Sequence, residues 1–156
     1  MEIVFLLTGK TDSKDILNIM SQFEKRLKHY TRFQIVELKP LKLKSPEKTH
    51  MLLAESEQQL KAIQDSDFLI LLDEKGSYGT SRQFSDQLQK WMNAGPKRLV
   101  FLVGGAFGFH ESLKARSNSI LSLSRMTFSH QIIRPIFLEQ LYRAFTILKN
   151  EPYHND

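Results

Sequence analysis

The alternation of short apolar runs with amphipathic segments is the feature of this sequence that most restricts its fold. Runs at Ile3–Leu7, Asp67–Leu72 and Arg98–Val103 have the length of strands and are almost entirely apolar, as parallel strands buried on both faces are. A fourth run, Phe33–Leu38, contains Phe, Ile and Val, which favour strands. The first intervening segment has helical spacing at Ile16, Met20, Phe23, Leu27 and Tyr30.

Strands that alternate with helices predict an α/β protein. We expect an open, mostly parallel sheet covered by helices on both faces. The chain has 156 residues, which suits one domain spanning residues 1–156.

Several helix boundaries carry local signals. Ser45 followed by Pro46 predicts an N-cap and a first helical position, with the helix running to about Ile63. Thr80 and Gln83 have the spacing of a capping box. The last helix is expected to open at Pro135. If it packs against a second copy, the interface would bury its stripe of Phe137, Leu141, Ala144, Phe145 and Leu148.

Three expected strand ends carry glycine or small polar residues, and ligands of open parallel sheets bind at such ends. They are Leu72–Asp73, Val103–Gly105 and Leu123–Arg125, the last following a short strand predicted at Ile120–Leu123. Asp73–Gly76 is interpreted as a polar turn. The glycine turn suits close approach of a ligand to the backbone, but a plain tight turn has the same pattern, so both interpretations stay open.

Composition narrows the classes of function. The chain has no cysteine, which excludes disulfides, thiolate metal sites and cysteine nucleophiles. It has no run of the ~20 apolar residues that span a bilayer, and the acidic Glu2 argues against a signal peptide, so we expect a cytoplasmic protein without a membrane partner. A net charge of +5 suits a polyanionic partner such as RNA or, alternatively, a solvated lysine-rich surface.

Four polar residues flank the last predicted helix. His130 and Arg134 lie at its start, and Tyr153 and His154 follow it. Histidine and tyrosine can donate, accept or carry protons, although an isolated histidine is often only a hydrogen-bonded surface residue. A helix of about 14 residues spans ~21 Å, so the two histidines can share a site only through a folded-back tail or a second subunit. No metal-ligand spacing is present, and no metal is expected.

Five motifs in the second half of the chain give it a family resemblance. They are LLDEKG (Leu71–Gly76), FLVGGAFGF (Phe101–Phe109), LSLSRMTFSHQIIR (Leu121–Arg134), EQLYRAF (Glu139–Phe145) and NEPYHND (Asn150–Asp156). With these motifs in this order, the chain resembles the bacterial ribosomal RNA large-subunit methyltransferase H family. These are small SPOUT-class enzymes that methylate a pseudouridine, and the resemblance covers the whole chain in length and element order.

The resemblance implies a C-terminal deep trefoil knot (an α/β knot), S-adenosyl-L-methionine as cofactor and a homodimer. The implied activity is methylation of N3 of a pseudouridine in 23S rRNA on the assembled ribosome. The family's cofactor-binding positions fall on Leu72, Gly104, Leu123, Ser124, Arg125, Met126, Thr127 and Phe128. Its polar positions near the reacting group fall on His130, Arg134, Tyr153 and His154.

The chain departs from the family pattern at three places. Ser129 stands where the family usually has proline, and Pro135 stands where a non-proline residue is frequent. The tail closes with Asn155 and Asp156 where the family commonly has a basic residue, so the resemblance does not extend to a terminal cationic contact to RNA.

Methyl transfer to N3 requires that the N3 proton leave. We expect His154 or His130 to assist deprotonation and Tyr153 to orient the base. Two other functions stay open at this point. One is a catalytically silent ribosome- or RNA-binding protein on the same scaffold, and the other is a different small-ligand α/β enzyme that uses the glycine turn.

Overall fold

A five-stranded parallel sheet forms the centre of the computed structural model, which describes residues 1–44 and 47–155. The strand order is β2-β1-β4-β3-β5, so the first strand lies inside the sheet and the last lies at an edge. The strands are β1 (Glu2–Thr8), β2 (Arg32–Leu38), β3 (Phe68–Ser77), β4 (Arg98–Val103) and β5 (Ser119–Leu121).

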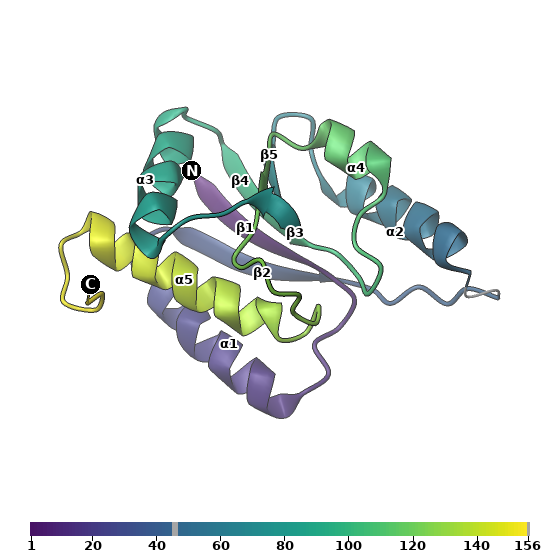
Figure 1. Cartoon of the computed structure of the whole chain (residues 1–156), viewed down its shortest axis with the longest axis horizontal. Helices are drawn as coiled ribbons and strands as arrows, with labels where there is room; N and C mark the ends of the chain where they lie inside the picture. The colour runs from purple at the N-terminus through teal and green to yellow at the C-terminus, as the bar shows by residue number, and fades with distance from the viewer. Residues whose placement is uncertain (45–46, 156) are drawn as a thin grey trace.

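Helices cover both faces of the sheet. Figure 1 shows α1, α3 and α5 on one face and α2 and α4 on the other. The predicted α/β fold with a parallel sheet and helices on both faces is therefore confirmed. The helices are α1 (Lys14–Leu27), α2 (Lys48–Ala62), α3 (Ser81–Asn93), α4 (Glu111–Arg116) and α5 (Ile133–Leu148).

The alternation of side chains along each strand divides the core into two layers. In β1, Ile3 and Phe5 face the larger layer under α1, α3 and α5, whereas Val4 and Leu6 face the smaller layer under α2 and α4. The ring of Phe137 from α5 lies 4.8 Å from the rings of both Phe5 and Phe101. Burying one such aromatic side chain contributes about 1.5–3 kcal/mol, so α5 is anchored over the centre of the sheet.

The last two strands differ from the sequence-based expectation. β3 does not end in a turn after Leu72 but continues to Ser77, with a register irregularity between these two residues where it pairs with β5. The continuation is held because Ser122 N donates a hydrogen bond of 2.8 Å to Ser77 O. β5 itself ends at Leu121, two residues before the end expected at Leu123. The residues from 73 to 76 therefore form an irregular, bulged part of β3 and not the polar turn expected there.

The last helix also differs from expectation. It begins at Ile133, two residues before Pro135, and most of its apolar stripe is buried against the sheet of its own subunit. Phe137, Leu141, Ala144 and Phe145 are at most 5% exposed within a single chain. The prediction that a dimer interface buries this stripe is therefore wrong. The cap expected at Ser45–Pro46 and the terminal Asp156 lie outside the described residues.

Candidate functional site

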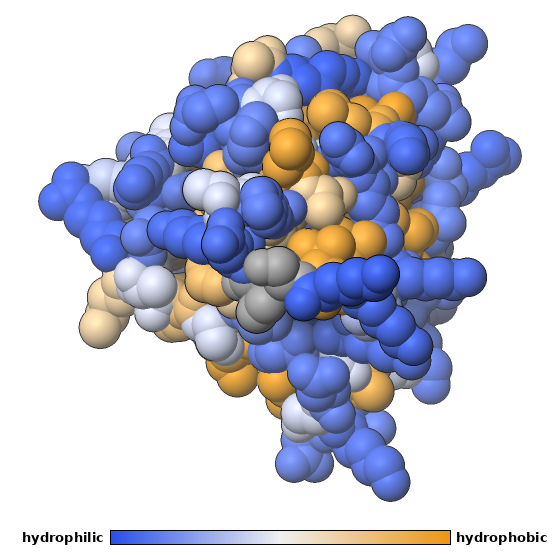
Figure 2. All heavy atoms as spheres, turned by 90° about the vertical axis from the view of Figure 1, so that its right-hand side faces the viewer, coloured by the Kyte–Doolittle hydropathy of each residue, from blue (hydrophilic) through white to orange (hydrophobic). Residues whose placement is uncertain are grey.

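The carboxyl ends of the central strands bring together the segments that the sequence singles out. Leu72 is the partner of Val103 on one side and of Leu121 on the other, so the irregular part of β3 after Leu72 and the segments after β4 and β5 lie at the same end of the sheet. Figure 2 views the molecule from the right-hand side of Figure 1, the end where β1 gives way to the loop before α1. Apolar patches gather there among hydrophilic side chains. The exposed apolar residues of the segments after β3, β4 and β5 are Tyr78, Phe107, Met126, Phe128 and Ile132.

Two adjoining hollows lie at this end. The smaller, of about 80 Å³, has apolar walls and two carboxylates, and is lined by Leu72, Asp73, Glu74, Leu121, Leu123, Ser124, Met126, Phe128 and Ile133. The larger, of about 630 Å³, shares Asp73, Glu74 and Phe128 with it and reaches Gly104, Thr127 and His130. Seven of the eight cofactor positions implied by the resemblance line one of these hollows. The eighth, Arg125, instead donates a hydrogen bond to Tyr78 Oη and lies 4.3 Å from the centre of its ring.

Hydrogen bonds fix the loop from 123 to 128. Ser122 Oγ donates to Ser124 O at 2.7 Å, and Met126 N donates to Ser124 Oγ at 3.0 Å. Thr127 Oγ1 donates to the Glu74 carboxylate, which ties the loop to the bulged part of β3. Met126, 74% exposed, is held out over the hollow by a preformed loop.

The turn after β4 requires glycine at position 104. A Cβ atom on Gly104 would lie 2.9 Å from the backbone oxygen of Gly108, which cannot move aside as a flexible side chain would. A bridge between Gly105 and Gly108 closes the turn. The turn is therefore a compact rim of backbone groups that a ligand can approach closely.

Arg134 is buried inside the protein rather than exposed to a substrate. Its side chain is 0% exposed and donates three hydrogen bonds, to His130 O (2.9 Å), Thr11 Oγ1 (2.7 Å) and Thr8 O (3.0 Å). Burial is the main cause that lowers its pKa. The guanidinium fastens the segment before α5 to the end of β1, and thereby sets the position of His130.

His130 borders the larger hollow. Burial first, and the nearby positive charge of Arg134 second, lower the pKa of its imidazole. A lowered pKa favours the neutral ring near neutral pH, and a neutral imidazole can accept a proton.

The C-terminal tail packs at the far end of α5. Arg143 donates to Glu139 Oε1 at 2.6 Å and lies 3.2 Å from Nδ1 of His154, while Tyr153 Oη donates to the same Glu139 oxygen at 3.1 Å. Burial and the Glu139 carboxylate raise the pKa of Tyr153. Arg143 lies ten residues beyond the start of α5, a rise of ~15 Å. The structure thus brings Tyr153 and His154 together but keeps them far from His130 within one chain.

Glu139 and Arg143 belong to this polar cluster and were not singled out from the sequence. Their four-residue spacing within EQLYRAF is that of a helical ion pair and is the signal that could have found them.

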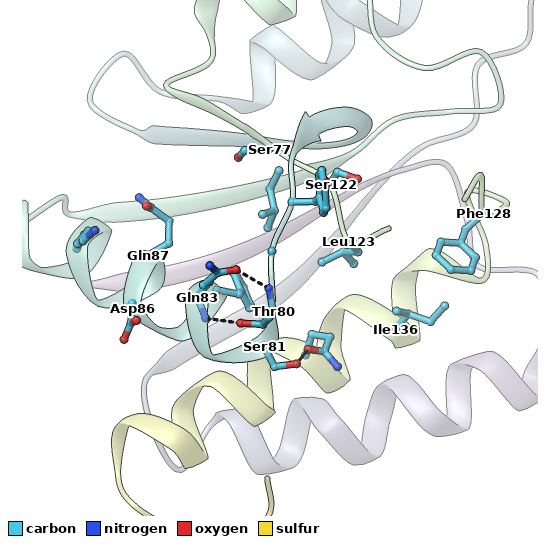
Figure 3. A pocket seen from close by; sticks show the side chains of 16 residues that line it. Ser77, Thr80, Ser81, Gln83, Asp86, Gln87, Ser122, Leu123, Phe128 and Ile136 are labelled. Atoms are coloured by element: carbon cyan, nitrogen blue, oxygen red, sulfur yellow. Dashed lines mark hydrogen bonds between the residues drawn. The ribbon is translucent and has the colours of Figure 1, made fainter. Parts of the chain in front are cut away.

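A third hollow, of about 530 Å³, lies on the other side of the loop from 123 to 128. Figure 3 shows Leu123, Phe128 and Ile136 at one end, and the start of α3 with the Thr80–Gln83 capping box at the other. The capping box is confirmed in both of its hydrogen bonds. Ser81 Oγ donates to Gln140 Oε1 at 2.8 Å and joins α3 to α5 beneath the hollow.

The described part of the chain, residues 1–44 and 47–155, has neither a metal cluster nor a membrane-spanning helix. No group of three or more His, Cys, Asp or Glu residues there could hold a metal ion. Over the same residues, no helix combines the length and the apolar character needed to cross a lipid bilayer.

Comparison with known proteins identifies the family. Residues 1–154 match the family described as "Predicted SPOUT methyltransferase". The chain is 47% identical to the ribosomal RNA large subunit methyltransferase H of Christiangramia forsetii, over 99% of both chains. It is 46% identical to the proteins of the same name from Parabacteroides distasonis, over 100% of both chains, and Flavobacterium psychrophilum, over 99% of both. With a match over nearly its whole length and relatives this similar, the chain belongs to the SPOUT methyltransferase family.

Proposed function

We propose that this protein uses S-adenosyl-L-methionine to methylate N3 of a pseudouridine in 23S rRNA on the assembled ribosome, in the cytoplasm. Relatives that align over their full length are named for methylation of large-subunit ribosomal RNA. The observation that carries the proposal is the convergence of Leu72, Gly104 and the loop from 123 to 128 at one end of the sheet. The net charge of +5 suits an RNA partner.

The residues around the two hollows fit S-adenosyl-L-methionine. Leu72, Met126 and Phe128 offer apolar walls for a planar base, and the turn at Gly104 offers backbone groups at close range. The carboxylates of Asp73 and Glu74 suit a ligand with a cationic sulfonium and an ammonium group. When bound, this cofactor supplies an electrophilic methyl group for in-line displacement.

The protein's own residues then orient the base and accept a proton. The neutral His130 beside the larger hollow is a candidate to accept the N3 proton, and Arg134 holds its backbone in position. Tyr153 and His154 supply a second set of polar groups to orient the base or take the proton. In-line methyl transfer depends strongly on alignment, so fixed loops contribute much of the catalysis.

A second protomer completes the site in this proposal. The tail lies ~15 Å along α5 from the segment that carries His130, so one chain alone does not join the two sets of polar residues. A symmetric homodimer would bring the tail of each protomer to the cofactor loops of the other. Family membership also supports a trefoil knot in the C-terminal part, where the chain runs from the edge strand β5 past β3 and into α5.

The activity is tested with ribosomes from a strain that lacks the protein. Purified protein and methyl-labelled S-adenosyl-L-methionine should yield a methylated pseudouridine, detected by mass spectrometry of 23S rRNA nucleosides. The Gly104→Ala variant should lose most activity because its new Cβ meets the Gly108 backbone, and circular dichroism verifies that this variant is folded.

Calorimetric titration with the cofactor distinguishes an active methyltransferase from a catalytically silent RNA-binding protein. Wild-type protein should bind S-adenosyl-L-methionine. A folded protein that binds ribosomes but not this cofactor would instead be a catalytically silent RNA-binding protein. The departures from the family pattern at Ser129 and Asn155 are the reason to test this alternative.

A further inference from the structure

A separate cavity of about 320 Å³, with both polar and apolar walls, lies between α2 and the segment that follows β1. Gly105, Ala106 and His130 border both this cavity and the larger hollow near Gly104. Its volume is at the lower end of the ~300–1,000 Å³ typical of small-ligand sites. An occupant would therefore lie next to the group bound at the proposed methylation site.

Two buried acceptor atoms belong to side chains that line this cavity and lack partners. Glu55 Oε2 and Gln58 Oε1 are both buried, and neither has a hydrogen-bond partner among the described residues. The amide of Gln58 cannot be turned round, because its nitrogen donates a hydrogen bond of 2.8 Å to Lys39 O. Buried acceptors are nearly always paired in folded proteins, so two unpaired ones on side chains that line the same cavity indicate that a hydrogen-bond donor is missing beside it.

The position of the Glu55 carboxylate is fixed by the glycine turn. A Cβ on Gly105 would lie only 2.5 Å from Glu55 Oε1, so the carboxylate rests directly against this glycine. Burial raises the pKa of Glu55, as expected for a carboxyl group without a cation beside it. The carboxylate is held at a cost to stability that a ligand with N–H groups would offset.

The remaining walls suit a nucleotide. Pro40, Leu41 and Met51 form apolar surface against which a base can lie. The exposed side chains of Lys10 and Lys39 at the rim suit a phosphate. Two lysines at the rim and two acceptors without partners inside match a nucleotide whose base carries N–H donors.

We propose that this cavity binds a nucleotide of the RNA substrate that neighbours the methylated one, and that it selects a base with an exocyclic amino group. The inference rests on the proposed function for its RNA substrate. Guanine fits best, because its N1–H and N2–H₂ donors lie side by side and can meet Glu55 and Gln58 together. Uracil fits worst, because its single N–H stands between two carbonyl oxygens that would face the two acceptors.

The four ribonucleoside monophosphates GMP, AMP, CMP and UMP test the cavity in NMR titrations of the whole protein. GMP should bind tightest and UMP weakest. The Glu55→Gln variant should bind GMP about ten- to hundredfold more weakly, the effect of losing one hydrogen bond to a charged group. Its unfolding midpoint in urea should not fall, because the substitution removes a buried charge. With ribosomes, its KM should rise while kcat stays near that of the wild type.

The matched control is Glu57→Gln, which makes the same change of charge on the exposed side of the same helix and should bind GMP like the wild type. Equal binding of all four nucleotides, unchanged GMP binding in Glu55→Gln, or no binding at millimolar concentration would each overturn the inference. The titration needs neither cofactor nor methyl transfer, so a failure here is separate from a failure of the proposed activity.

Discussion

At the scale of single residues, Arg134 is a structural cation at the edge of the candidate active site. It is fully buried and bonded to two backbone oxygens and to the Thr11 hydroxyl. Arg134→Met leaves these acceptors unpaired and should lower the free energy of unfolding by about 3 kcal/mol. Urea denaturation at neutral pH measures the change. Arg32→Met, at an exposed position of the edge strand β2, is the control and should change it by less than ~0.5 kcal/mol. An equal loss in both variants would contradict this role.

The lowered pKa of His130 predicts a dependence of stability on pH. Below about pH 6.5 the unfolded chain protonates this histidine while the folded protein resists protonation, so stability falls as pH falls through this range. His130→Gln should therefore reduce the difference in unfolding free energy between about pH 7.5 and about pH 5.5. Urea denaturation at both pH values tests this. The exposed His29, changed to Gln, should leave the difference as it is in the wild type.

At the scale of elements, the capping box at the start of α3 makes a contribution to stability that can be measured by itself. Thr80 Oγ1 accepts from Gln83 N at 3.2 Å, and Thr80 N donates to Gln83 Oε1 at 2.8 Å. Thr80→Ala should lower the free energy of unfolding by about 1 kcal/mol, whereas Thr80→Ser retains the hydroxyl and should stay within a few tenths of the wild type. Denaturation curves of the two variants distinguish loss of the cap from loss of the methyl group. Equal destabilisation by both would show that the hydroxyl is not what stabilises the helix.

The irregular strand β3 is the element that shapes the two hollows near Leu72 and Gly104. Because the strand resumes at Ser77, the residues between Leu72 and Ser77 are pushed out beside the loop from 123 to 128. Asp73 and Glu74 consequently line both hollows instead of lying in a distant turn.

At the scale of the whole molecule, the proposal requires two chains for one active site. Mixing a cofactor-site variant, Gly104→Ala, with a tail variant, Tyr153→Phe/His154→Ala, should restore activity that neither shows alone. In random heterodimers one of the two sites is intact, so the mixture should reach about a quarter of the wild-type rate. Methyl transfer after subunit exchange measures it, and sedimentation should give a particle of twice 18.2 kDa. A monomer, or a mixture without restored activity, would contradict the shared site.

The sequence by itself determined the local elements and the fold class. Apolar runs such as Arg98–Val103 and the Thr80–Gln83 box act through contacts a few residues apart, so their structure follows from nearby chemistry. It also indicated that Leu72 and Gly104 would meet, because parallel strands share their carboxyl ends.

Only the tertiary structure decided which polar groups face a cavity and which are buried as supports. Arg134 is buried because Thr8 and Thr11, more than a hundred residues away, offer it partners. Glu55 borders a cavity with its carboxylate against Gly105 from the turn after β4, and β3 continues past Leu72 because Ser122 pairs with Ser77. These outcomes depend on contacts between distant segments, which local periodicity and spacing do not encode.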